Sequence, residues 1–303
     1  MRPAKFTLFI LIIFSSLILA QPPTLKLATY LYQFLEGEID GARLKKVSGI
    51  ATDLSGFLYL ADTGNNRILK ITPEGTSVKT IGGFGWEKEQ FYTPLDICTG
   101  SALDVFVADY ENHRIQRYDK DLNYISSLYS DENLEVTFRF GYPRSIGLSI
   151  HGDLFIVDGE NNRVLKFNAS GDPEISFGDY RDGSGRLLEP VQLAIAPKDK
   201  IYVSDRRTHK IFAFDYFGNF LFDFGSTLLK EPLGICFSSE GRLLVADASA
   251  KQIVVFDSLG EFIFKWSMIT PQLGEFKNPV DVAVHQQRVF VVDNDRILVF
   301  ELK

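Results

Sequence analysis

The sequence predicts an all-β fold: a six-bladed β-propeller in which each blade is a four-stranded antiparallel sheet. An apolar run ending in aspartate occurs six times, and each time a polar turn and a basic or amide residue follow it. The chain is also rich in large aromatic side chains, with 26 Phe and 12 Tyr among 303 residues. Several short strands per repeat of about 40–50 residues are typical of propeller blades. Such blades must pack on one another, because one small sheet cannot bury both of its faces.

Residues 1–20 have the composition of a secretory signal peptide. Arg2 and Lys5 precede the uncharged apolar run Phe6–Leu19, and Ala20 is a small residue at the expected cleavage position. The run is short for a membrane-spanning helix, which needs about 20 residues. We therefore expect a secreted or periplasmic protein, and contact with a membrane only if the segment stays uncleaved as an anchor. Cleavage would change the formal charge from −7 to −9, because the segment carries two cations and no acid.

Residues 21–303 are predicted to form the propeller. The run before each repeated aspartate is the second strand of a blade, and the basic or amide residue after the turn begins the third. An apolar residue and, three positions later, a proline precede the first strand in five repeats, whereas Val47 replaces the proline in the first repeat. The aspartates recur every 42 to 49 residues, at Asp62, Asp109, Asp158, Asp205, Asp247 and Asp293.

The N-terminal strand is predicted to close the ring. The sixth repeat reaches Lys303 just after its third strand, and residues 27–34, LATYLYQF, form an additional strand ahead of the first repeat. Pairing of this strand with the last blade completes that blade and covers a sheet edge that would otherwise invite aggregation. We therefore expect a single domain, and a monomer in solution.

Two segments resemble the NHL repeat family. Val107–Gln116 reads VADYENHRIQ and Leu60–Ile68 reads LADTGNNRI, and both are similar to the central phrase of that repeat. The Phe-x-x-Pro entry matches as well, so the resemblance covers nearly all of the chain after residue 20. It implies a six-bladed propeller. For function it implies several classes, because the family includes binding modules, extracellular sensor domains and a few enzymes.

The residues that recur in every blade are predicted to be structural. A side chain repeated six times serves the scaffold, and aspartate commonly accepts hydrogen bonds from backbone N–H groups of the turn that follows it. Cys98 and Cys236 occupy the same slot in opposite blades, too far apart for a disulfide, and are expected to be free. Functional sites are therefore expected where the repeats differ.

The four histidines argue against one enzymatic function. Peptidyl-hydroxyglycine lyases, which are NHL-like, hold a catalytic zinc with three histidines at the propeller axis. Here His113 and His209 are predicted in turns on one face of the disc, and His151 and His285 in turns on the opposite face. Histidines divided in this way do not supply three ligands to one ion.

The third residue of each innermost strand breaks the symmetry beside the central channel. Asp96, Ser145, Gln192 and Asp281 are the candidate ligand-binding residues of the channel mouth, and the other two blades carry glycine there. The interpretation that we favour is a water-filled channel lined by polar groups, without a cofactor. The alternative is a Ca²⁺ ion held by Asp96, Gln192 and Asp281, because carboxylate and amide oxygens suit a hard cation.

The loops on the same face are the longest, and loops on a rigid scaffold commonly carry recognition. They span residues 82–93, 129–142, 178–189 and 267–278. The alternative is that they carry only solvated charges and aromatic covers over the blade seams. The candidate ligand-binding residues of this loop face are Trp86, Arg144, Arg186, Arg206, Arg207 and His209.

The leading hypothesis is a non-enzymatic binding or scaffold module for a protein, peptide or glycan, with no catalytic residue assigned. The negative charge and the export signal argue against nucleic acid as a partner. The alternative hypothesis is a metal-dependent hydrolase or lyase, lactonase-like or peptidyl-hydroxyglycine-lyase-like, that uses the carboxylates of the channel mouth.

Overall fold

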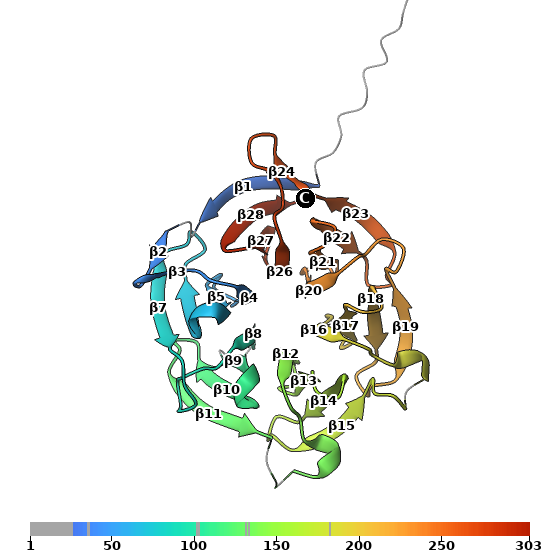
Figure 1. Cartoon of the computed structure of the whole chain (residues 1–303). Helices are drawn as coiled ribbons and strands as arrows, with labels where there is room; N and C mark the ends of the chain where they lie inside the picture. The colour runs from blue at the N-terminus through green and yellow to red at the C-terminus, as the bar shows by residue number, and fades with distance from the viewer. Residues whose placement is uncertain (1–26, 35–36, 101–103, 131, 133, 182) are drawn as a thin grey trace, which may run out of the picture.

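Six four-stranded antiparallel sheets are arranged around a central axis (Figure 1). The computed structural model describes residues 27–34, 37–100, 104–130, 132, 134–181 and 183–303. This architecture confirms the predicted six-bladed propeller. The predicted signal peptide, residues 1–20, lies outside the described residues. In the described part of the chain, no helix has the length and apolar character needed to cross a membrane.

Each blade runs from an innermost strand at the channel to an outermost strand at the rim (Figure 1). Blade 1 consists of β4 (Val47–Thr52), β5 (Leu58–Asp62), β6 (Arg67–Ile71) and β7 (Ser77–Gly82). Blade 2 consists of β8 (Pro94–Thr99), β9 (Asp104–Asp109), β10 (Arg114–Asp119) and β11 (Tyr124–Tyr129). Blade 3 consists of β12 (Pro143–Leu148), β13 (Leu154–Asp158), β14 (Arg163–Phe167) and β15 (Pro173–Phe177). Blade 4 consists of β16 (Pro190–Ile195), β17 (Ile201–Asp205), β18 (Lys210–Phe214) and β19 (Phe220–Phe224). Blade 5 consists of β20 (Pro232–Phe237), β21 (Leu243–Asp247), β22 (Gln252–Phe256) and β23 (Phe262–Trp266). Blade 6 consists of β26 (Pro279–His285), β27 (Arg288–Asp293), β28 (Arg296–Leu302) and β1 (Ala28–Phe34).

Short elements are confined to the connections between these strands. They are two hairpins, β2 (Glu38–Ile39) with β3 (Ala42–Arg43) and β24 (Met268–Thr270) with β25 (Gly274–Glu275), and the 3₁₀ turns η1 (Thr63–Asn65), η2 (Tyr110–Asn112), η3 (Val136–Phe138) and η4 (Gly183–Gly185).

The N-terminal strand closes the ring, as predicted. β1 pairs antiparallel with β28, from Ala28 opposite Leu302 to Phe34 opposite Ile297. The first and last strands of the described chain therefore share blade 6, and backbone hydrogen bonds hold the two ends of the ring together.

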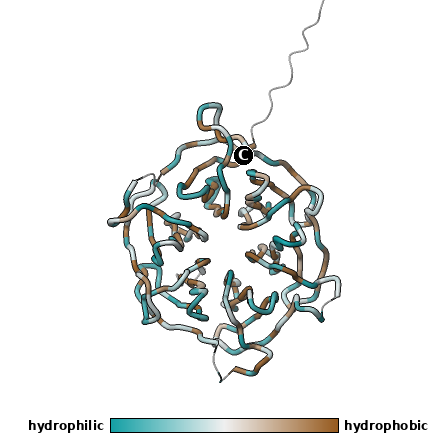
Figure 2. Tube along the Cα trace, in the orientation of Figure 1, coloured by the Kyte–Doolittle hydropathy of each residue, from teal (hydrophilic) through white to brown (hydrophobic). Residues whose placement is uncertain are grey.

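Aromatic and aliphatic side chains fill the seams between blades. Six buried clusters occur in the described part of the chain, and each joins two neighbouring blades. In the seam between blades 3 and 4, Phe177 packs on Phe214 with ring centroids 4.9 Å apart. Figure 2 shows hydrophobic residues in the strands between the channel and the rim. Because the second strands are covered by a blade on each side, they read as continuous apolar runs.

Phe214→Ala is expected to lower the free energy of unfolding by about 3–5 kcal/mol, because it opens a cavity in a seam. Phe214 is 0% exposed, whereas Phe217 in the turn that follows is 70% exposed. Phe217→Ala is the matched control and should change stability by no more than about 0.5 kcal/mol. Urea unfolding of both variants measures the difference, and equal effects would show that the seams do not carry the stability of the ring.

Candidate functional site

The innermost strands impose a requirement on the channel. Each has a neighbouring strand on one side only, so the N–H groups of its other edge point towards the axis and need acceptors. A bulge follows the proline position in each of the six strands. The N–H groups concerned belong to the residues at Ile50, Ile97, Ile146, Leu193, Ile235 and Val282.

The predicted channel residues supply the acceptors for these groups. In four cases the side chain of one blade reaches the backbone N–H of the next blade around the ring. These bonds join Asp96 to Ile146 at 3.0 Å, Ser145 to Leu193 at 3.1 Å, Gln192 to Ile235, and Asp281 to Ile50 at 2.8 Å. The polar residues of the channel therefore fasten neighbouring blades together.

The other two N–H groups show why glycine and aspartate occur in neighbouring blades. In the blades that precede those of Asp96 and Asp281, the third position of the innermost strand is glycine, which has no side-chain acceptor for the N–H of the next blade. Each aspartate accepts with its second oxygen the N–H of the residue after it, Ile97 at 2.9 Å and Val282 at 2.8 Å. A Cβ on Gly234 would lie 2.4 Å from the Cα of Asp281, so this glycine also permits the close approach of the two strands.

Asp96 and Asp281 are buried at the axis, with exposures of 4% and 0%. Desolvation raises the pKa of both carboxyls, and the charge of Asp96 raises the pKa of Asp281 further. The hydrogen bonds to both carboxyls oppose this rise. The Nε2 of Gln192 donates to Oδ1 of Asp96 at 3.3 Å. Both carboxyls therefore hold a proton more readily than an exposed aspartate does.

The predicted calcium ligands are thus near one another, but their oxygens already serve the scaffold. All four carboxylate oxygens of Asp96 and Asp281 and the Oε1 of Gln192 accept a backbone N–H. The donor types suit a hard cation. Among the residues described, however, no three His, Cys, Asp or Glu side chains form a group that could hold a metal ion. Calcium at this position stays the alternative to the favoured interpretation, a water-filled channel lined by polar groups.

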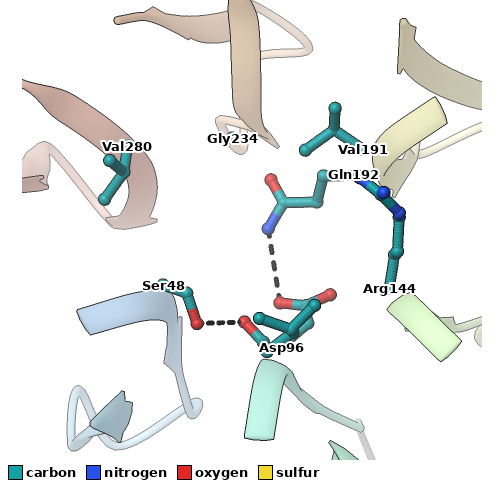
Figure 3. Close-up of a pocket in the computed structure, with 8 residues that line it drawn as sticks. Ser48, Asp96, Arg144, Val191, Gln192, Gly234 and Val280 are labelled. Carbon is teal, nitrogen blue, oxygen red and sulfur yellow. Dashed lines mark hydrogen bonds between the residues drawn. The ribbon is translucent and has the colours of Figure 1, made fainter. Parts of the chain in front are cut away.

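Asp96 and Gln192 form part of a layer that separates two axial cavities, because both residues line each of them. On the loop-rich side the cavity has a volume of about 90 Å³, and on the opposite side about 240 Å³. The residues around the smaller cavity are Ser48, Leu95, Asp96, Arg144, Val191, Gln192, Gly234 and Val280 (Figure 3). A mouth of about 520 Å³ shares Ser48, Val191 and Val280 with this cavity.

The structure distributes the predicted cations of the loop face over several environments. Arg206 is paired with Glu189, and its other terminal nitrogen lies 4.0 Å from Glu231. Arg186, Arg207 and His209 are exposed. Arg144 belongs to the innermost strand β12 rather than to a loop, and it is the one member of this predicted set that lines the 90 Å³ cavity.

An exposed aromatic cluster occupies the loop between blades 1 and 2. Trp86 is 67% exposed, and its ring lies 5.8 Å from that of Phe84, which lies 5.1 Å from Tyr92. The buried Arg114 holds this loop from beneath, donating to the carbonyls of Trp86, Glu87 and Gln90 at 2.8 to 2.9 Å. The predicted aromatic anchor is therefore presented on an ordered loop.

The repeated aspartates are structural, as predicted, but their main backbone donors differ from those expected. Asp62, Asp109 and Asp293 accept N–H groups of the loop that enters the blade, each at 2.8 Å, rather than of the turn that follows. The following turn contributes in some blades, as at Asp205. Four blades add an arginine pair: Arg67 with Asp62, Arg114 with Asp109, Arg163 with Asp158, and Arg296 with Asp293, at 2.7 to 2.9 Å.

The histidines lie on two faces, as predicted. His113 and His209 are in turns between second and third strands, and His151 and His285 are at turns between first and second strands. Both cysteines are free. The sequence did not identify the second position of each innermost strand as part of the site, although these residues line the smaller cavity, the mouth or both. The available signal was that Arg144 is the one charged residue there.

Comparison with known proteins supports the repeat and the fold. The model of the NHL repeat matches residues 91–118, in blade 2. Protein SUPPRESSOR OF QUENCHING 1, chloroplastic, from Arabidopsis thaliana is 26% identical over 217 residues, or 59% of this chain. Protein brain tumor from Drosophila melanogaster is 28% identical over 157 residues, or 48% of this chain. The matches span 20% and 14% of the lengths of these two relatives.

Solved structures of similar fold include enzymes and a protein complex. A gluconolactonase from Xanthomonas campestris has a TM-score of 0.68 at 18% identity and covers 91% of this chain and 95% of its own. A streptogramin B lyase has a TM-score of 0.65 at 14% identity, with 90% and 98% covered. A chain of a nidogen/laminin complex has a TM-score of 0.61 at 16% identity, with 80% and 87% covered. At such low identity the likeness concerns the fold alone.

Asp281→Asn is expected to alter how stability depends on pH. Because the pKa of Asp281 is higher in the folded protein than in the unfolded chain, the folded state binds more protons above about pH 4. The free energy of unfolding of the wild type should therefore fall relative to that of the variant as pH rises through the raised pKa. Urea unfolding between about pH 4 and about pH 8 measures this trend.

The matched control is Glu261→Gln, at an exposed carboxylate in the turn between β22 and β23. It should leave the trend of the wild type unchanged. If Asp281→Asn and the wild type show parallel pH profiles, the raised pKa of Asp281 is contradicted.

Proposed function

We propose that this propeller is a binding module whose loop-rich face binds a protein, peptide or glycan. The observation that carries the proposal is the exposed cluster of Phe84, Trp86 and Tyr92 on a loop held by Arg114. Contiguous apolar surface of this kind on a soluble fold is a common mark of an interaction site. Aromatic rings can stack on sugar rings or pack against apolar peptide side chains.

The aromatic surface continues towards blade 3. The backbone N–H of Glu111 donates to the carbonyl of Tyr92, which places Tyr110 beside the cluster. The ring of Tyr110 lies 5.0 Å from that of Tyr142, and Tyr142 lies 4.5 Å from His113. A ligand along this surface would therefore meet aromatic side chains from two blades. The loop that carries Trp86 is already ordered by Arg114, which lowers the entropy cost of binding.

A metal-dependent hydrolase or lyase is the second candidate function. The observation in its favour is the raised pKa of Asp96 and Asp281 beside the axial cavities. A buried carboxyl that keeps its proton can serve as a general acid. Against this stands the use of every oxygen of the two carboxyls by backbone N–H groups of the scaffold.

Trp86→Ala is expected to weaken binding by about tenfold or more, because it removes the most exposed ring of the cluster. Arrays of oligosaccharides and short peptides, probed with labelled wild type and variant, provide the measurement. Phe217→Ala is the control, since Phe217 is equally exposed but lies in a turn on the opposite face. The proposal is overturned if no array binding depends on Trp86, or if Phe217→Ala weakens binding equally.

The enzymatic alternative predicts turnover of a lactone, an ester or a hydroxyglycine peptide, with and without added Ca²⁺ or Zn²⁺, that is lost in Asp96→Asn. The binding proposal predicts no turnover of these substrates. Glu261→Gln is again the control, because it changes an exposed acid away from the axis. Turnover that survives in the control and disappears in Asp96→Asn would establish the enzyme.

A further inference from the structure

One guanidinium lines the axial cavity on the loop-rich side. Arg144 occupies the second position of β12 and is half-buried at the cavity wall (Figure 3). Its side chain makes no hydrogen bond or ion pair with any described residue, although its charge, after that of Arg206, helps to lower the pKa of Glu189. The equivalent positions of the other innermost strands carry small or aliphatic side chains: Ser48, Leu95, Val191, Leu233 and Val280. The N–H donors of Arg144 are therefore available to a ligand.

Gly159 provides the space in which Arg144 lies. It directly follows the repeated aspartate of blade 3, where the other blades have larger residues, and its φ is not in the left-handed region that favours glycine. A Cβ on Gly159 would lie 2.8 Å from both Cγ and Nε of Arg144 and 2.9 Å from the backbone oxygen of Tyr142. The φ of Gly159 therefore does not require glycine, but the Arg144 side chain and the Tyr142 carbonyl together leave no room for a Cβ at this position. Arg144 and Gly159 form a matched pair found in blade 3 alone.

The chemistry of the cavity suits a small anion with an apolar stem. Leu95, Val191 and Val280 are apolar walls, and the volume of about 90 Å³ admits a carboxylate and its adjoining methylene. Asp96 also lines the cavity, but its oxygens accept the N–H groups of Ile97 and Ile146. Asp96 is an acid at the floor of the cavity, and its repulsion of a ligand grows with the negative charge of that ligand. A singly charged carboxylate is therefore favoured over a phosphate dianion.

The mouth above the cavity is also cationic. Its volume is about 520 Å³, and it is lined by Lys45 and Lys46 together with Asn278, Asn294 and Asp295. Asp295 already accepts the backbone N–H of Lys46 at 2.9 Å. Both lysines are exposed, on a protein whose formal net charge is −7. This local excess of positive charge favours the approach of an acidic chain.

We propose that this axial funnel, formed by the mouth and the cavity beneath it, binds an acidic peptide segment. One side-chain carboxylate pairs with the Arg144 guanidinium in the cavity, and the adjoining peptide lies in the mouth beside Lys45 and Lys46. Arginine recognises a carboxylate through two parallel N–H donors, which fixes the orientation of the ligand as well as adding affinity. The inference rests on the proposed function and names the ligand chemistry of the loop-rich face.

Three tetrapeptides serve as probes, with the full-length chain as the binding partner in calorimetry or NMR titration. The first has blocked ends and one internal glutamate, the second has glutamine in its place, and the third contains only glycine with a free carboxyl terminus. The glutamate peptide should bind at least about tenfold more tightly than the glutamine peptide. Tighter binding of the third than the first would assign the pocket to a chain terminus and overturn the side-chain assignment.

Arg144→Gln should abolish the preference for glutamate, and Arg144→Lys should restore part of it. Lys251→Gln is the matched control, because Lys251 is an exposed cation in the turn between β21 and β22, on the same face, and lines neither the cavity nor the mouth. Gly159→Ala should also weaken the preference without changing any charge, since it displaces Arg144. Should Gly159→Ala fail to fold, the two substitutions of Arg144 still decide the test.

The inference is overturned if wild type binds the glutamate and glutamine peptides equally, or if Lys251→Gln reduces the preference as much as Arg144→Gln does. If Trp86-dependent array binding persists while the glutamate preference is absent, the inference fails and the proposed function stands. If no binding to the loop-rich face is found at all, both fail.

Discussion

The free inner edges of the six innermost strands are the constraint on which the channel depends. Six separate sheets arranged around an axis leave these edges without a neighbouring strand, and each bulged strand has an N–H group on this edge that needs an acceptor. Polar side chains of the channel accept those N–H groups, so the ring of blades is fastened at its narrowest part. A buried N–H without an acceptor would cost about 1–3 kcal/mol, which makes this polar ring a condition of folding.

The repeated aspartates make the corresponding connection at the loop-rich face. Each buried carboxylate accepts N–H groups of the loop that enters its blade, and the arginine paired with it reaches the carbonyls of the same loop in blades 1 to 3. A buried ion pair adds little net stability by itself, because desolvation offsets the attraction. Its main effect here is geometric. The loops that carry the aromatic cluster are fixed to the scaffold from beneath.

The sequence was sufficient for the repeat count, the strand order and the closure of the ring, because each depends on a pattern that recurs or on an unpaired strand. The use of the channel residues was not accessible in the same way. Asp96 and Asp281 accept N–H groups that a bulge leaves free, and one N–H group of each pair belongs to a neighbouring blade. Neither the bulge nor the contact with the next blade can be recognised in the local sequence. Arg144 was predicted to belong to the loop face, whereas the structure places it in β12 at the wall of the axial cavity.

The same constraint explains why acids and cations occupy different levels of the channel. The side chain at the third position of each innermost strand must accept an N–H of the next blade, unless the aspartate of that next blade accepts it instead. Arginine and lysine are unsuitable at this position because their side chains have no acceptor atom. The second position has no such duty. A cation can therefore appear at the second position without breaking a seam, as Arg144 does. The hydrogen-bonding needs of the backbone thus place acceptor side chains at the floor of the funnel, and they leave the residues above the floor free to include a cation such as Arg144.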